Sequence, residues 1–73
     1  MIFVTITEPA GRPLFVDGNY AKDEGLSPVT RMLPAGPHLF ETIDPVSKKP
    51  DHRERTDNKV ADGTGVTITL KKL

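Results

Sequence analysis

The sequence predicts an all-β protein, either a small antiparallel β-sandwich or a partly open barrel of five to six short strands. Three observations support this prediction. Apolar residues alternate with polar ones in short runs, turn clusters rich in proline and glycine separate these runs, and no segment has the length and spacing of a helix. The chain has 73 residues. A single domain spanning residues 1–73 is therefore predicted, since so short a chain encloses only one thin core.

The first strand is predicted at residues 2–7, where Ile2, Val4 and Ile6 share one face. β-branched residues in period two are typical of a half-buried strand. A proline- and glycine-containing break at residues 8–13 ends this strand. The second strand is predicted at residues 14–16, and it ends at an Asp-Gly pair that favours a tight turn.

Residues 19–28 are predicted to form a loop closed by Gly25. A third strand is predicted at residues 29–33, and a Pro-Ala-Gly-Pro turn leads from it into a fourth at residues 38–43. The facing of the fourth strand is open, because Phe40 competes with Leu39 for the interior. A last strand is expected at residues 66–70. The predicted core residues are Ile2, Val4, Ile6, Leu14, Val16, Val29, Leu33, Leu39, Ile43, Val66, Ile68 and Leu70.

The segment 44–59 is predicted to be a polar loop or edge strand. Val46 is its only aliphatic residue, and charged side chains dominate the rest. Its second part, at about residues 53–60, is the candidate edge strand, since charged edges prevent unwanted strand pairing.

The composition excludes several classes of protein. The chain has no cysteine, so a disulfide framework and a thiolate metal site are absent, and this fits a cytosolic or an exported protein equally. Ten basic residues balance ten acidic ones, which favours no nucleic-acid partner. No apolar stretch approaches the ~18–20 residues of a membrane span, so membrane insertion is not expected.

No catalytic set, metal site or cofactor site is predicted. Asp17 and Asn19, followed by two acidic residues at 23 and 24, suggest calcium, but the positions that complete an EF-hand pattern do not match. His38 and His52 are too sparse for catalytic zinc. The two serines lie outside any nucleophile motif. The sequence therefore predicts a protein that is not an enzyme and needs no cofactor.

Turn residues between positions 9 and 43 resemble those of a PEGA domain, a small β-sandwich module. The likeness lies in Pro-Ala-Gly at 9–11, the strand ending in Asp-Gly at 14–18, Gly-Leu-Ser-Pro at 25–28 and Leu-Pro-Ala-Gly-Pro-His at 33–38. The sequence departs from the family after Pro9 and after the fourth strand. The resemblance implies a non-catalytic accessory module, with a role in binding surfaces or carbohydrate, and it transfers no catalytic residues.

Phe3 and Phe15 are predicted to point away from the core, because their neighbours point into it; the alternative for Phe3 is burial under segment 44–59. Outward aromatic side chains favour an exposed contact patch. The predicted contact residues are Phe3, Phe15, Tyr20, Lys48, Lys49, Arg53 and Arg55. The expected function is a binding or spacer module that contacts a protein partner or a surface polymer. The alternative is a structural subunit of a homomeric or phage-type assembly, hence a homo-oligomer.

Overall fold

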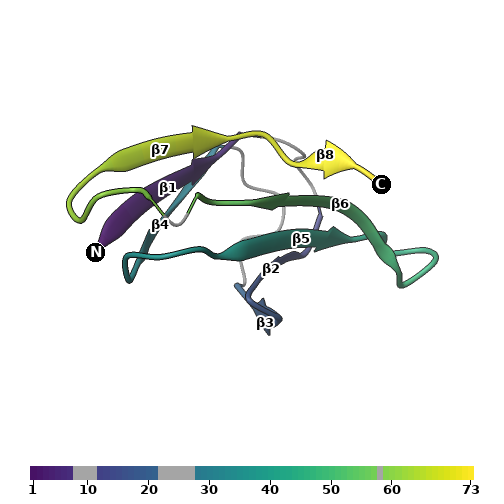
Figure 1. Ribbon diagram of the computed structural model, residues 1–73. Helices are drawn as coiled ribbons and strands as arrows, with labels where there is room; N and C mark the ends of the chain where they lie inside the picture. The colour runs from purple at the N-terminus through teal and green to yellow at the C-terminus, as the bar shows by residue number, and fades with distance from the viewer. Residues whose placement is uncertain (8–11, 22–27, 58) are drawn as a thin grey trace.

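The computed structural model describes residues 1–7, 12–21, 28–57 and 59–73. Within these ranges the protein contains strands and no helix (Figure 1). The strands are β1 (Ile2–Ile6), β2 (Leu14–Val16), β3 (Asn19–Tyr20), β4 (Val29–Leu33), β5 (Leu39–Ile43), β6 (Pro50–Arg55), β7 (Gly65–Ile68) and β8 (Lys71–Lys72). The predicted all-β class is confirmed. The prediction of a loop from residue 19 needs correction, because β3 begins there; Gly25 lies outside the described residues.

The strands form two sheets. A three-stranded sheet has the order β4-β1-β7, and a five-stranded sheet has the order β3-β2-β5-β6-β8. All pairs are antiparallel, as predicted, except β1 with β7, which run parallel. A parallel pair requires a long crossover. Here four strands of the five-stranded sheet, β2, β3, β5 and β6, lie in the chain between β1 and β7.

The two sheets are joined on one side and open on the other. On the joined side, the chain passes from β7 in the three-stranded sheet through Leu70 to β8 in the five-stranded sheet (Figure 1). On the other side, the edge strands β4 and β3 belong to different sheets and are not paired with each other. We call this open side the seam. The arrangement is a small sandwich that is not closed into a barrel.

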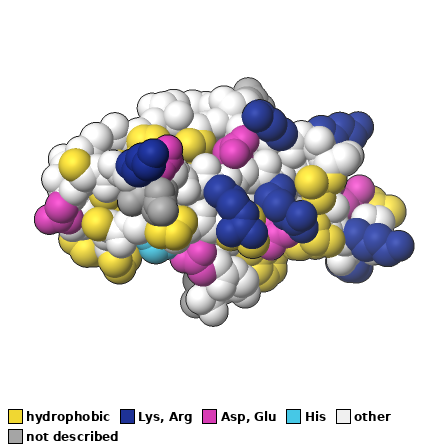
Figure 2. Space-filling view, viewed as in Figure 1, with side chains coloured by type: hydrophobic (Ala, Val, Ile, Leu, Met, Phe, Trp, Pro, Cys, Tyr) yellow, Lys and Arg dark blue, Asp and Glu magenta, His cyan; other side chains and the backbone are white. Residues whose placement is uncertain are grey.

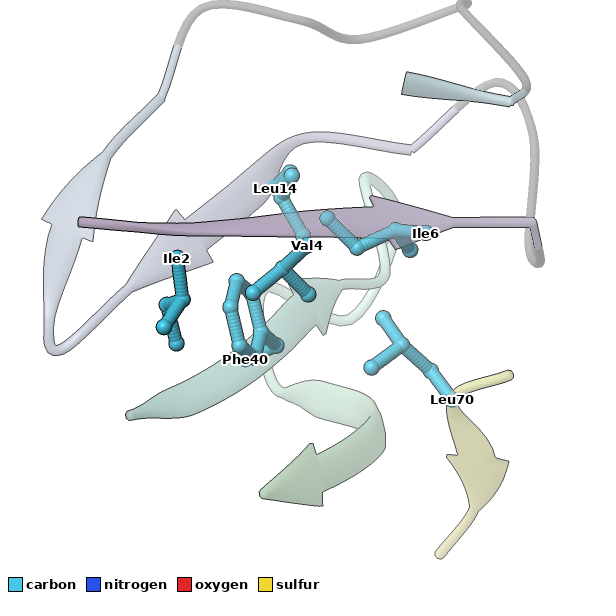
Figure 3. Packing of buried hydrophobic residues seen from close by; sticks show 6 residues of the cluster. All are labelled: Ile2, Val4, Ile6, Leu14, Phe40 and Leu70. Carbon is cyan, nitrogen blue, oxygen red and sulfur yellow. The ribbon is translucent and has the colours of Figure 1, made fainter. Parts of the chain in front are cut away.

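The core is thin and lies between the two sheets. Among the described residues, six hydrophobic ones are buried: Ile2, Val4, Ile6, Leu14, Phe40 and Leu70. The three β1 side chains point toward Phe40 and Leu70, which come from the opposite sheet and from the link between the sheets (Figure 3). The predicted core residues Val16, Val29, Leu33, Val66 and Ile68 pack against this cluster and are partly buried.

Of the two facings considered for the fourth strand, the structure has the one with Phe40 inside, so the placement of Leu39 and Ile43 in the core was wrong. In β5, Phe40 is fully buried and Thr42 is 1% exposed, whereas the predicted core residues Leu39 and Ile43 are only half-buried. The physical reason is the pairing with β2, which places Phe40 opposite Val16 and Thr42 opposite Leu14, on the inner face. Leu39 and Ile43 therefore share the outer face with the charged Glu41.

The polar segment 44–59 contains a regular strand. β6 begins at Pro50, three residues before the predicted edge strand, and ends at Arg55. It is not an edge, because β8 pairs with it at His52 and Arg53. Residues 44–49 form the β5–β6 turn, in which Asp44 accepts a backbone hydrogen bond from Lys48 at 2.8 Å. The last predicted strand, at 66–70, is divided at Leu70 between β7 and β8.

A polar cluster closes the end of the core near the β5–β6 turn. The buried Thr42 hydroxyl donates to Asp51 at 2.6 Å, and Arg12 Nε lies 3.1 Å from the other oxygen of the same carboxylate. Burial by itself raises the pKa of Asp51, but the hydrogen bond from Thr42, the His52 ring with Nδ1 3.0 Å from the carboxylate, and the charge of Arg12 outweigh it and lower that pKa. The buried hydroxyl therefore has a hydrogen-bond acceptor for its proton, which is why a threonine is tolerated inside the core.

Candidate functional site

Six of the seven predicted contact residues belong to the outer face of the five-stranded sheet or to the turn at its end, and only Phe3 does not. Leu14 on β2 is buried and points inward, so the intervening Phe15 points outward. Strand register then places Tyr20 and Glu41 on either side of Phe15, and Arg53 beyond Glu41. The Phe15 and Tyr20 rings pack against each other with centroids 5.5 Å apart and a 44° tilt. This geometry is typical of a stabilising aromatic pair.

Beside Tyr20, the seam opens into a pocket of about 400 Å³. Residues from both sheets line it: Val16, Asp17, Asn19, Tyr20, Ala21, Arg31, Leu33, Pro34 and His38. Arg31 Nη2 on β4 donates to the Ala21 carbonyl just after β3, so a hydrogen bond ties the two edges together across the seam. The volume falls within the range of small ligand sites, about 300–1,000 Å³. No pattern in the sequence predicts a concave site in so small a sandwich.

Asp17 and His38 form a hydrogen-bonded pair at the rim of this pocket. His38 Nδ1 lies 2.6 Å from Asp17 Oδ2, His38 Nε2 lies 2.7 Å from the Pro34 carbonyl, and the Leu39 amide donates to Asp17 Oδ1 at 2.8 Å. Asp17 has φ of 51° in the turn before Gly18, a left-handed conformation that aspartate tolerates. The pair therefore joins the β2–β3 turn to the start of β5.

The environment of the pair favours its charged forms. The hydrogen bond with Asp17 is the main cause that raises the pKa of His38, and the Pro34 carbonyl acts in the same direction against the effect of burial. The hydrogen bond with His38 is likewise the main cause that lowers the pKa of Asp17, followed by the Leu39 amide. Both ring nitrogens face acceptors, so the imidazolium satisfies both, whereas the neutral ring satisfies one.

This pair is arranged as a structural link. A histidine that acts as a general base needs a free ring nitrogen to accept a proton, but His38 Nε2 is already occupied by the Pro34 carbonyl. Ser47 lies exposed in the β5–β6 turn, and Ser27 lies outside the described residues. The absence of enzymatic activity stays a prediction.

Basic side chains gather over β6, β8 and the β5–β6 turn, as Figure 2 shows. Arg53 donates to Glu41 through both Nε (2.9 Å) and Nη2 (2.7 Å), so much of its charge is compensated. Arg55 is exposed on the same face, opposite Leu39. The exposed Lys48 and Lys49 lie beyond the end of β5, away from the aromatic pair. The predicted basic contact residues therefore form a separate, secondary region.

Phe3 lies on the other sheet. It is 43% exposed on the outer face of the three-stranded sheet, where it pairs with Met32 on β4 and Gly65 on β7. Burial under segment 44–59, the alternative for this residue, does not occur. Of the three predicted aromatic contacts, the structure joins Phe15 and Tyr20 and leaves Phe3 apart.

Neither known proteins nor a metal site identify a function for this chain. No protein-family model, curated protein or solved structure matches the chain, so the resemblance to a PEGA domain stays a prediction. Across the described ranges, no group of three or more acidic or histidine side chains could hold a metal ion. Two of the acids considered for calcium, at 23 and 24, lie outside those ranges. Nor does the described part of the chain contain a helix long and apolar enough to span a membrane.

Proposed function

We propose that this protein is a non-catalytic binding module that holds a protein segment at the seam. One observation carries the proposal: Tyr20 belongs both to the aromatic pair with Phe15 and to the lining of the pocket. The two features therefore form one contact surface, an aromatic pair beside a pocket. Aromatic anchors and pockets of this kind provide most of the energy at protein interfaces.

The chemistry of the lining favours an apolar side chain as the anchor of the partner. Val16, Leu33 and Pro34 contribute apolar surface to the pocket. The carboxylate of Asp17 and the ring of His38 are already hydrogen-bonded to each other and to the backbone. A sugar ring needs several free polar groups, whereas an aromatic or aliphatic side chain needs a complementary cavity.

The test is a screen of a short-peptide library and a glycan array against the wild type and three variants. Each variant replaces one aromatic residue by serine, two of them at the contact surface and one on the opposite sheet. Peptides with an aromatic or aliphatic anchor are expected to bind the wild type and Phe3→Ser equally. Tyr20→Ser and Phe15→Ser are expected to weaken binding by at least about tenfold, the effect of losing an anchor of ~1.4 kcal/mol. Isothermal titration calorimetry with the selected peptides measures these affinities.

Phe3→Ser is the control, because it removes an aromatic side chain from the opposite sheet that is as exposed as Tyr20. Equal losses in Phe3→Ser and Tyr20→Ser would exclude the seam as the contact surface. Binding of glycans but not peptides, lost in Tyr20→Ser, would replace the protein partner with a carbohydrate.

A further inference from the structure

The edge of β7 differs from the other sheet edges in being unprotected. Natural sheets shield their edges with very short strands, lysine, proline or other charged residues. In the five-stranded sheet, the edge strand β3 has two residues and the edge strand β8 is Lys71–Lys72. In the three-stranded sheet, β4 carries Arg31 and is flanked by Pro28 and Pro34. β7 has the sequence Gly-Val-Thr-Ile, with no charge and no proline.

The backbone of β7 presents open hydrogen-bonding groups at this edge. Phe3 donates to the Thr64 carbonyl at 3.0 Å and Thr7 donates to the Ile68 carbonyl at 3.1 Å, so the even-numbered residues from 64 to 68 direct their backbone groups toward β1. Because successive residues alternate between the two edges, Gly65 and Thr67 direct theirs outward. Among the described residues, none forms a backbone hydrogen bond with these outward groups.

We propose that β7 pairs antiparallel with β7 of a second copy of this chain, so that the two three-stranded sheets become one continuous sheet. A two-fold axis at Thr67 places Thr67 opposite its equivalent, and both residues direct their N–H and C=O groups across the interface. The same register places Val66 opposite Ile68 of the partner subunit. Both side chains are half-buried on the inner face, and their contact covers apolar surface that one copy leaves exposed.

A second copy fits this edge better than a strand from a charged partner. The edge carries no charge, so self-pairing incurs no like-charge repulsion, whereas pairing between two copies of β8 brings four lysines together. Association would add stability that the small core lacks, since domains of this size rarely gain more than ~3–5 kcal/mol from one core. The proposal is independent of the seam, which lies on the opposite side of the sandwich.

The test places charges at the centre of the proposed interface. Thr67 is exposed and its backbone groups take no part in the β1 ladder, so Thr67→Lys and Thr67→Glu are expected to fold. In the wild type, multi-angle light scattering on a size-exclusion column is expected to show the mass rising from monomer to dimer as the concentration approaches about 1 mM. Each single variant is expected to raise the dissociation constant at least about tenfold, because like charges then face each other.

An equimolar mixture of Thr67→Lys and Thr67→Glu is expected to restore the dimer, since opposite charges meet. Thr30→Lys, on the edge strand β4, is the matched control and is expected to associate like the wild type. A wild type that stays monomeric at about 1 mM would overturn the proposal. So would dissociation by Thr30→Lys alone, or a mixture that remains monomeric while both variants are folded by circular dichroism.

Discussion

Phe40→Ala is expected to remove most of the free energy of unfolding. Phe40 is the largest fully buried side chain, and it fills the space between the two sheets opposite Ile2 and Val4 (Figure 3). Truncating a buried phenylalanine costs about 3–5 kcal/mol, through lost burial and the cavity left behind. A domain of this size holds about 3–5 kcal/mol from its core. Urea denaturation followed by far-ultraviolet circular dichroism measures the loss.

Leu39→Ala is the matched control, since it truncates the neighbouring apolar residue on the opposite face of the same strand. Leu39 is only half-buried, so its truncation is expected to cost less than about 1.5 kcal/mol. Equal losses, or a larger loss in Leu39→Ala, would show that the strand faces the other way.

The second largest effect on stability is expected for Asp17→Ala, at about 2 kcal/mol. The substitution removes the acceptor of the Leu39 amide and the partner of His38. The loss of these two hydrogen bonds is expected to cost about 1 kcal/mol, because the carboxylate is half-exposed. It also places alanine at φ of 51°, which costs about 1 kcal/mol more. Asp17→Asn tolerates this backbone and keeps an acceptor for the Leu39 amide. It is therefore expected to lose less than about 1 kcal/mol.

The same pair predicts a pH dependence with a defined sign. The pKa of His38 is raised above 6.5, so its contribution to stability is complete below pH 6.5 and is lost as the pH rises through the raised value. The pKa of Asp17 is lowered below 3.8, so its contribution is complete above pH 3.8 and is lost as the pH falls through the lowered value. The pair therefore stabilises the fold fully between these limits.

Urea unfolding of the wild type and Asp17→Asn on both sides of pH 6.5 tests this dependence. The free energy of unfolding of the wild type is expected to fall as the pH rises through the raised pKa of His38, and that of the variant to fall less. An equal fall in both proteins would show that the pair makes no contribution.

Local patterns were sufficient to predict β1, β2, β4, β5 and β7 and most of the core, but not the two-residue strands β3 and β8. Alternation over residues 2–6 placed β1 and its buried face correctly, because a half-buried strand needs no distant information. The facing of β5 failed because apolar residues occupy both faces. The charge of Glu41, which shares a face with Leu39, was the signal that could have resolved it. The burial of Thr42 depends on Asp51, a partner nine positions further along that no local pattern reveals.

The candidate site depended more strongly on topology. The Asp-Gly turn after residue 16 was enough to predict that Phe15 faces Tyr20, had the hairpin been continued into Asn19 and Tyr20. Predicting the pocket required the relative positions of β3 and β4, which belong to different sheets. Phe3 was grouped with Phe15 because both point outward, but they lie on the outer faces of different sheets.

Nuclear Overhauser spectroscopy of the three phenylalanines and the single tyrosine tests the arrangement most directly. The structure predicts cross-peaks between the Phe15 and Tyr20 rings, and between the Phe40 ring and the methyl groups of Ile2 and Val4. Cross-peaks that join the Phe15 ring to those methyl groups, or the Phe3 ring to Tyr20, would contradict both the facing of the sheets and the contact surface built on it.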